Sequence, residues 1–261
     1  MRMWKDGSES GDYFSDIAAG RVPGKRSVHK FGQAVLSTAD VKEDIWSYSG
    51  NYTWPTTFPH YISSSDDSDT QELIIEGIGP DFKRKIETWT LEGQTKKAIG
   101  DWYRIYRMKN NSGDEITPGV DFAGNIYAYE DDTVDAGVPE TPAKITAYIS
   151  ASLDKNQTQM TVFTVPINER GQIWALWPKI VSRLTKAATG TILIRNRYGV
   201  FREQEVYSLN SAGTTYGGGK LAVPLVLEPL TDVIVTGTPS SNDLLVAFSY
   251  DMILEDIENA D

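Results

Sequence analysis

The chain has no cysteine and only two histidines among its 261 residues. The lack of cysteine excludes disulfide scaffolds, cysteine nucleophiles, cysteine-type zinc sites and iron–sulfur clusters, although it does not fix the compartment. His29 and His60 lie in arm-like and loop-like contexts, with no partner pattern for a catalytic triad or a metal site. We therefore expect a protein that is not an enzyme and that has no cofactor.

Positive charge is also in short supply, because 25 Lys and Arg residues face 36 Asp and Glu residues, for a net charge of −11. Such a surface repels DNA and anionic membranes. No apolar run is long enough to span a bilayer, and the N-terminal MRMWKDGSESGDYF has no apolar run of the signal-peptide type. We expect neither a nucleic-acid partner nor a membrane partner, and a protein that leaves the cytoplasm only by cell lysis.

Short β-branched or aromatic runs, each bounded by Gly, Asn, Asp or Pro, dominate the chain from Tyr48 onward. The runs span residues 71–78, 86–93, 101–108, 125–130, 144–150, 160–166, 190–197, 200–209, 232–237 and 244–250. Short strands separated by turn residues favour antiparallel sandwiches or barrels over βαβ units. The predicted fold class is therefore all-β, with two antiparallel β-sandwich or jelly-roll-like domains and an extended N-terminal arm.

Two segments have other patterns. The segment Thr38–Trp46 predicts a short helix, because Asp40 and Glu43 have capping-box spacing. In IWALWPKIVSRL the apolar residues have helical spacing, but Pro178 in its middle would disrupt a helix. We predict two strands there, with a break at Pro178.

A loop or linker is predicted at residues 131–143, where DDTVDAGVPETPA combines four acids with Gly137, Pro139 and Pro142. It divides the chain into two β halves of similar size. The predicted organisation is an extended basic arm over residues 1–33, a first β domain over residues 34–135 and a second β domain over residues 136–261.

The segment Gly20–Gln33 is basic and contains no acid. Its glycines and proline disfavour a stable helix, so we interpret it as an extended arm. One interpretation is a disordered, solvated terminus, and the other is an arm that binds a partner, since a free tail needs no apolar residues. The predicted partner-binding residues are Arg21, Lys25, Arg26, Val28, Lys30 and Phe31.

The loop SSSDDSDT offers candidate Ca²⁺ ligands in Asp66, Asp67 and Asp69, because Ca²⁺ prefers several oxygen ligands. It lacks the Gly and terminal Glu of an EF-hand, and Asx-turns at a strand entry are the alternative. The sequence also holds seven Trp, thirteen Tyr and eight Phe, several in loop-like contexts. These aromatics fit an interface, the plugged ends of a sandwich, or stacking on sugars.

Eight different short segments follow one another along the chain, at residues 22–33, 43–46, 63–70, 76–82, 87–95, 103–110, 124–129 and 163–166. Examples are VPGKRSVHKFGQ, ETWTLEGQT and YRIYRMKN. Together they resemble a family of tailed-bacteriophage virion proteins, often encoded near capsid genes in marine and freshwater phage genomes. The resemblance covers residues 20 to 210 and implies a structural protein of the particle, with no catalytic residues to carry over.

The resemblance implies a head decoration or cement protein that binds and stabilises the capsid. Its expected partners are the major capsid protein or another virion protein, and further copies of itself as a homo-oligomer, with a trimer as one option. The expected location is the virion, assembled in the host cytoplasm. The alternatives are a neck, tail or baseplate component and a glycan-binding module on the virion surface.

Overall fold

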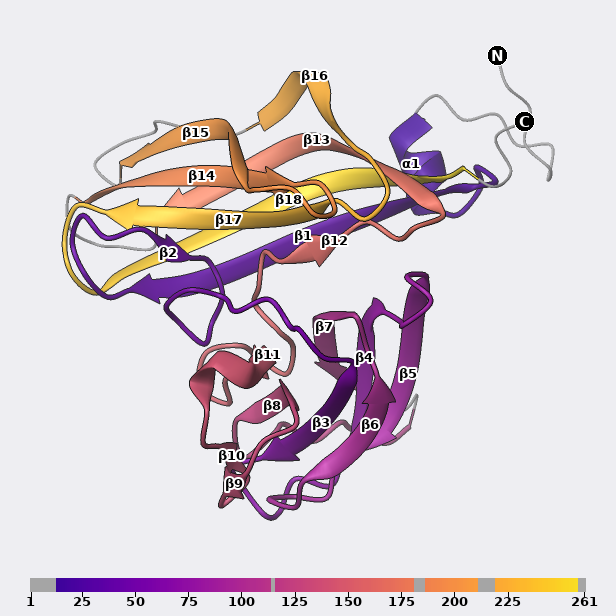
Figure 1. The fold of residues 1–261 in the computed structure, drawn as a ribbon, viewed down its shortest axis with the longest axis vertical. Coiled ribbons are helices and arrows are strands. Elements are labelled where there is room, and N and C mark those ends of the chain that lie inside the picture. The colour runs from indigo at the N-terminus through magenta and orange to yellow at the C-terminus, as the bar shows by residue number, and fades with distance from the viewer. Residues whose placement is uncertain (1–12, 114–115, 181–185, 211–218, 258–261) are drawn as a thin grey trace.

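The computed structural model describes residues 13–113, 116–180, 186–210 and 219–257. The regular structure consists almost entirely of antiparallel strands, which confirms the all-β prediction. The strands form two bodies, one above the other in Figure 1. We call residues 13–45 and 163–257 the terminal body, because it holds both ends of the described chain, and residues 46–162 the inserted body.

Two sheets build the terminal body. The first has the order β1 (Lys25–Leu36), β18 (Leu244–Asp256), β13 (Glu169–Ile180) and β16 (Gly219–Leu227). The second has the order β12 (Phe163–Thr164), β17 (Asp232–Pro239), β14 (Ala187–Arg195) and β15 (Arg202–Asn210), and β2 (Glu43–Asp44) also pairs with β17. A short helix, α1 (Tyr13–Ala18), packs Ile17 against Ile253 and Trp174 on the first sheet.

Alternation along the strands explains how these sheets bury a common core. In β18 the side chains of Val246, Phe248 and Tyr250 are buried, and the residues between them are partly exposed. Successive side chains of a strand point to opposite faces, so a single strand supplies one core face and one outer face. Val235 of β17 and Ile192 of β14, in the other sheet, belong to the same buried cluster.

The chain leaves the terminal body after β2 and returns to it at β12, and both short strands pair with β17. β2 pairs with Thr236 and Gly237 of β17, and β12 pairs with the same strand further along, at Asp232 and Val233. The two short strands therefore form one interrupted strand along β17. Trp46 forms a bridge with Met160, so the inserted body begins and ends at neighbouring positions (Figure 1).

The inserted body consists of two sheets and a small hairpin. One sheet has the order β11 (Ile145–Ile149), β8 (Ile126–Glu130), β3 (Pro59–Ser64) and β6 (Lys97–Asp101). The other has the order β5 (Arg84–Thr90), β4 (Glu72–Ile78) and β7 (Arg104–Asn110). The hairpin pairs β9 (Val134–Asp135) with β10 (Val138–Pro139), and a 3₁₀ turn, η1 (Pro142–Lys144), follows. Trp102, Ile62 and Leu73 are fully buried between the two sheets.

The structure confirms the predicted runs and corrects their grouping. Each of the ten runs overlaps a strand. The boundary predicted between residues 135 and 136 lies inside the β9–β10 hairpin, and the strands before and after it share the core of the inserted body. The domains are therefore not sequential halves, because the first strand of the chain pairs with the last, β1 with β18.

Two local predictions are also wrong. The segment Thr38–Trp46 is not helical, since the main chain leads through turns into β2 at the sheet edge. β13 runs through Pro178 without a break. Among the described residues β16 pairs with β13 as far as Leu176, so Pro178 lies beyond the described part of that pairing, and a strand edge tolerates the missing N–H of proline.

Helices long and apolar enough to cross a membrane are absent from the part of the chain that the structure describes.

Candidate docking surface

The predicted basic arm is mostly a core element of the first sheet. Residues 25–36 form β1, which pairs with β18 from Lys25 opposite Glu255 to Leu36 opposite Leu244. Residues 1–12 of the predicted arm lie outside the described residues. The arm prediction is therefore wrong for β1, because this strand supplies buried side chains that the terminal body needs.

Alternation in β1 separates the predicted partner-binding residues onto two faces. Arg26, Val28 and Lys30 share the inner face. The Arg26 guanidinium donates hydrogen bonds of 2.9 and 2.7 Å to the two carboxylate oxygens of Glu169, and Val28 packs against the core. Lys30 is buried, and its ammonium donates to the carbonyl oxygen of Tyr106.

The remaining predicted residues are more exposed. Lys25 pairs with Glu255 at 2.8 Å, and Arg21, in the turn before β1, lies 3.4 Å from the buried carboxylate of Asp16. Phe31 lies on the outer face of β1, beside the ring of His29. The structure therefore does not gather the predicted basic residues into one surface, and most of their charges are neutralised within the chain.

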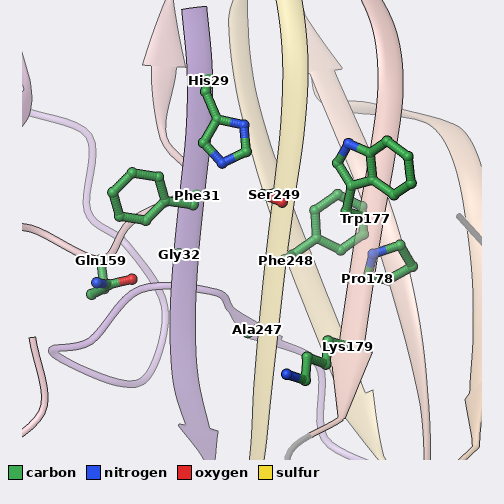
Figure 2. Close-up of a pocket in the computed structure, with 10 residues that line it drawn as sticks. All are labelled: His29, Phe31, Gly32, Gln159, Trp177, Pro178, Lys179, Ala247, Phe248 and Ser249. Atoms are coloured by element: carbon green, nitrogen blue, oxygen red, sulfur yellow. The ribbon is translucent and has the colours of Figure 1, made fainter. Parts of the chain in front are cut away.

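The outer face of the first sheet is instead aromatic. We call the side chains of Phe14, His29, Phe31, Trp174 and Trp177 the outer aromatic face. Figure 2 shows His29 on β1 and Trp177 on β13, with β18 between them. These two residues line a surface cavity of about 410 Å³, together with Phe31, Ser249 and Lys179. This face of the sheet thus carries aromatic rings among polar side chains such as Ser249 and Lys179.

Asp251 of β18 fixes the centre of this surface. Its Oδ1 lies 2.6 Å from Nδ1 of His29, and its Oδ2 accepts a hydrogen bond of 2.8 Å from Nε1 of Trp177. A carboxylate that holds two rings from neighbouring strands restricts their rotamers before any partner arrives. Pre-set side chains of this kind lower the entropy cost of docking.

A β-bulge brings the two tryptophans of β13 to the same surface. The register against β18 shifts between Ile173 and Ala175, so Trp174 is the extra residue. Trp174 stacks edge-on with Phe14 of α1 at 5.2 Å and, with Trp177, lines a neighbouring cavity of about 330 Å³. The indole Nε1 of Trp174 is buried and has no hydrogen-bond partner within the described part of the chain. A spacing of three residues is not a strand spacing, so the sequence pattern missed this pair.

The candidate Ca²⁺ ligands are already used to hold their loop. Asp69 is buried, and its Oδ1 accepts a hydrogen bond of 2.8 Å from the N–H of Ala123. Its Oδ2 accepts hydrogen bonds of 2.9 Å from the N–H of Gly124 and of 2.5 Å from the hydroxyl of Ser64. Asp66 accepts from the N–H and hydroxyl of Ser68, which lowers the pKa of Asp66.

The Asx-turn alternative is thus confirmed, and Asp67 is exposed. Within residues 13–257, outside the three internal gaps in the description, His, Asp and Glu side chains form no group of three suited to a metal ion. The Ca²⁺ prediction is therefore corrected, since the loop carboxylates accept hydrogen bonds from the chain itself.

No family model matches the chain, and no curated protein matches it. Among solved structures, the VP2 subviral particle of infectious bursal disease virus is 10% identical, over 97% of this chain and 75% of that chain, with a TM-score of 0.24. The Gt strain of the same virus gives 9% identity over 95% of this chain and 79% of that chain, with a TM-score of 0.22. TM-scores this low carry no argument about the fold or the function of this chain.

Proposed function

We propose that this protein is a virion structural protein, a head decoration or cement protein that docks through its outer aromatic face. Its role is structural rather than enzymatic in this proposal. The observation that carries it is the pair Phe31 and Trp177 on one sheet face, with Trp177 44% exposed. Exposed aromatic clusters mark interaction sites, and aromatics are enriched at the centres of protein interfaces.

The proposal includes a jelly-roll fold for the terminal body. If β2 and β12 are counted as one interrupted strand, the strands in chain order give sheets 1-8-3-6 and 2-7-4-5. This order is that of two Greek keys wound into a double sheet. Jelly rolls occur in viral capsid and lectin domains, so the fold supports a virion role without selecting it.

Docking in this proposal depends on apolar area more than on charge. Lys25 and Arg26, which the sequence predicted to bind a partner, have carboxylate partners within the chain in Glu255 and Glu169. The expected partners remain the major capsid protein or another virion protein, and further copies of this chain. A partner of this surface would present an apolar patch that covers the two tryptophans.

The test places a Phe31→Ser/Trp177→Ser chain in particles assembled in the host. We expect the variant to fold with an unchanged melting temperature and to be absent from particles, whereas Ile86→Ser leaves occupancy normal. Ile86 is the matched control, because it is 49% exposed on the inserted body. Normal occupancy of the double variant contradicts docking through this face.

Cryo-electron microscopy of intact particles separates the positions within the virion. Hundreds of copies per particle support a head protein, and a few copies to a few dozen indicate a neck, tail or baseplate component. The exposed rings of Trp177 and Phe31 also favour a second candidate, a glycan-binding module, because aromatic faces stack on sugars. Glycan-array binding that is lost in Trp177→Ser, with normal particle occupancy, would select that alternative.

A further inference from the structure

A cleft between the two bodies collects positive charge in an otherwise acidic chain. The cavity has a volume of about 230 Å³ and is lined from β1 of the terminal body and from β4, β5 and β7 of the inserted body. Its cationic residues are Arg26, Lys30, Arg84 and Arg107. The chain as a whole has a net charge of −11, so this cleft differs in sign from the average surface.

Two of the four cations are neutralised. Arg26 makes the two-pronged pair with Glu169, and Arg84 pairs with Glu76 at 2.8 Å. Glu76 is therefore engaged on its Oε1 side by an arginine, and it also receives the hydroxyl of Tyr106 at 3.5 Å. These pairs leave Lys30 and Arg107 as the cleft cations without an ion pair among the described residues.

A β-bulge in β7 presents the carbonyl oxygen of Tyr106 to Lys30. The register between β4 and β7 shifts after Glu76, which leaves Tyr106 as the extra residue of β7. A bulged residue is left out of the ladder, so its carbonyl is available to other donors. The Tyr106 carbonyl accepts from the Lys30 ammonium, which has three N–H donors and makes this one hydrogen bond among the described residues.

Arg107 offers a second unused donor next to Lys30. Among the described residues its buried Nε has no hydrogen-bond partner, and its Nη2 donates to the side-chain oxygen of Gln157 at 3.5 Å. A buried N–H without an acceptor costs free energy, and a buried ammonium without a counter-charge costs more. An anion in the cleft would remove both costs at once, because it accepts from both side chains.

We propose that the cleft between the bodies binds a phosphate-class oxyanion, held by the Lys30 ammonium and the Arg107 guanidinium. A tetrahedral oxyanion accepts several charge-assisted hydrogen bonds. The compact Lys30 ammonium and the planar Arg107 guanidinium can both donate such bonds to it. The ion would bridge β1 to β7 and so join the two bodies. Lys30 and Arg107 are not part of the outer aromatic face, although His29 and Phe31 of that face also line the cleft.

The protonation of Lys30 gives the site a pH dependence. The pKa of Lys30 is lowered to about 7, mainly by burial; the nearby Glu76 acts to raise this pKa, and Arg107 acts to lower it. Other titratable or charged groups that face the cleft or contact its residues are Arg26, His29, Arg84, Tyr106 and Glu169. Since an anion favours the charged ammonium, binding takes up a proton above this pKa, and affinity falls as the pH rises.

The experiment is calorimetric titration of the full chain with sulfate, whose charge is constant from pH 6.5 to 8.5. We expect sulfate to bind at pH 6.5, and Lys30→Met and Arg107→Gln each to weaken binding by about tenfold or more. Arg202→Gln is the matched control, because Arg202 is exposed on β15, and it is expected to bind like the native chain. The affinity of the native chain should fall from pH 6.5 to 8.5, and that of Lys30→Met should not.

Inorganic phosphate and glycerol phosphate then identify the source of the oxyanion. Competition of sulfate by both compounds indicates a site open to organic phosphomonoesters, and competition by phosphate alone indicates a free ion. Absence of sulfate binding, or equal binding by native, Lys30→Met and Arg107→Gln chains, overturns the proposal. Arg107→Gln keeps the test valid if Lys30→Met fails to fold, since Arg107 is partly exposed.

Discussion

The two bodies of this protein reach similar β architectures by different chain paths. The terminal body joins the first described strand to the last and relies on strands of up to 13 residues, such as β18. The inserted body is one continuous segment whose strands are no longer than seven residues. The comparison teaches that the continuous segment carries its own core, whereas the terminal body depends on pairing between distant parts of the chain.

The bodies also use their aromatic residues differently. In the inserted body Trp46, Tyr52 and Trp54 pack edge-on against one another, at 5.1 Å between successive rings, near the junction. In the terminal body Phe31 and Trp177 lie on the outer face instead. Packed and exposed aromatic residues, which the sequence left as alternatives, are thus both present in this protein.

The largest expected effects come from two changes to the chain: removing the inserted body, and cutting the chain between residues 135 and 136. We expect a chain in which residues 47–159 are replaced by a short Gly–Ser linker to fold, because Trp46 and Met160 already pair. We expect fragments 1–135 and 136–261 to remain unfolded, since the cut separates β1 from β18 and divides both cores. Circular dichroism and urea titration measure both outcomes, and a cooperative transition in fragment 136–261 would contradict the comparison.

Large-to-small substitutions in the two cores test whether the bodies unfold separately. Phe248→Ala in the terminal body and Trp102→Ala in the inserted body should each lower the free energy of unfolding by about 3–5 kcal/mol. Both side chains are almost completely buried. In urea titrations each variant should shift only the transition of its own body, while Val223→Ala, 77% exposed, shifts neither. A shift of both transitions by either variant would show that the bodies unfold as one unit.

The pH dependence of stability tests the contact between the bodies. Lys30 has an ordinary pKa of 10.5 when unfolded and about 7 when folded. Between these values the unfolded chain holds a proton that the folded chain lacks, so the free energy of unfolding rises with pH in this window, by about 1.4 kcal/mol per pH unit.

The measurement compares native and Lys30→Met chains at pH 6.5 and 9 in buffers free of sulfate and phosphate. The native chain should gain stability at pH 9 relative to the variant. Asp44, with a pKa raised to about 6 by burial, completes most of its titration below this window. An identical pH dependence of both chains would refute the buried state of Lys30.

The smallest expected change in the free energy of unfolding comes from substitutions in the acidic loop of the inserted body. Asp69→Ala should lower the free energy of unfolding by about 2–3 kcal/mol, because it leaves two buried N–H groups without an acceptor. Asp67→Ala should change it by less than about 0.5 kcal/mol, because Asp67 is exposed. Chemical denaturation in EDTA and in Ca²⁺ should give the same pair of values, and stabilisation by Ca²⁺ would restore the metal-site prediction.

The sequence predicted strands well where alternation and turn residues coincide. The runs that became β4, β8 and β17 all show β-branched or aromatic residues between turn formers. It predicted β1 poorly, because the basic residues of VPGKRSVHKFGQ were read as solvent-exposed. Arg26 and Lys30 are accommodated in β1 only through Glu169 and the Tyr106 carbonyl, which lie far along the chain.

The sequence by itself determined the antiparallel β class, because strand propensity and turn chemistry are local properties of the chain. Only the tertiary structure decided how the strands group, since the pairing of β1 with β18 and of β2 with β17 joins residues about as far apart as the chain allows. It also decided where Trp174 and Lys30 point. Both positions depend on a bulge, and a bulge is defined by the register of two strands, which a one-dimensional pattern does not contain.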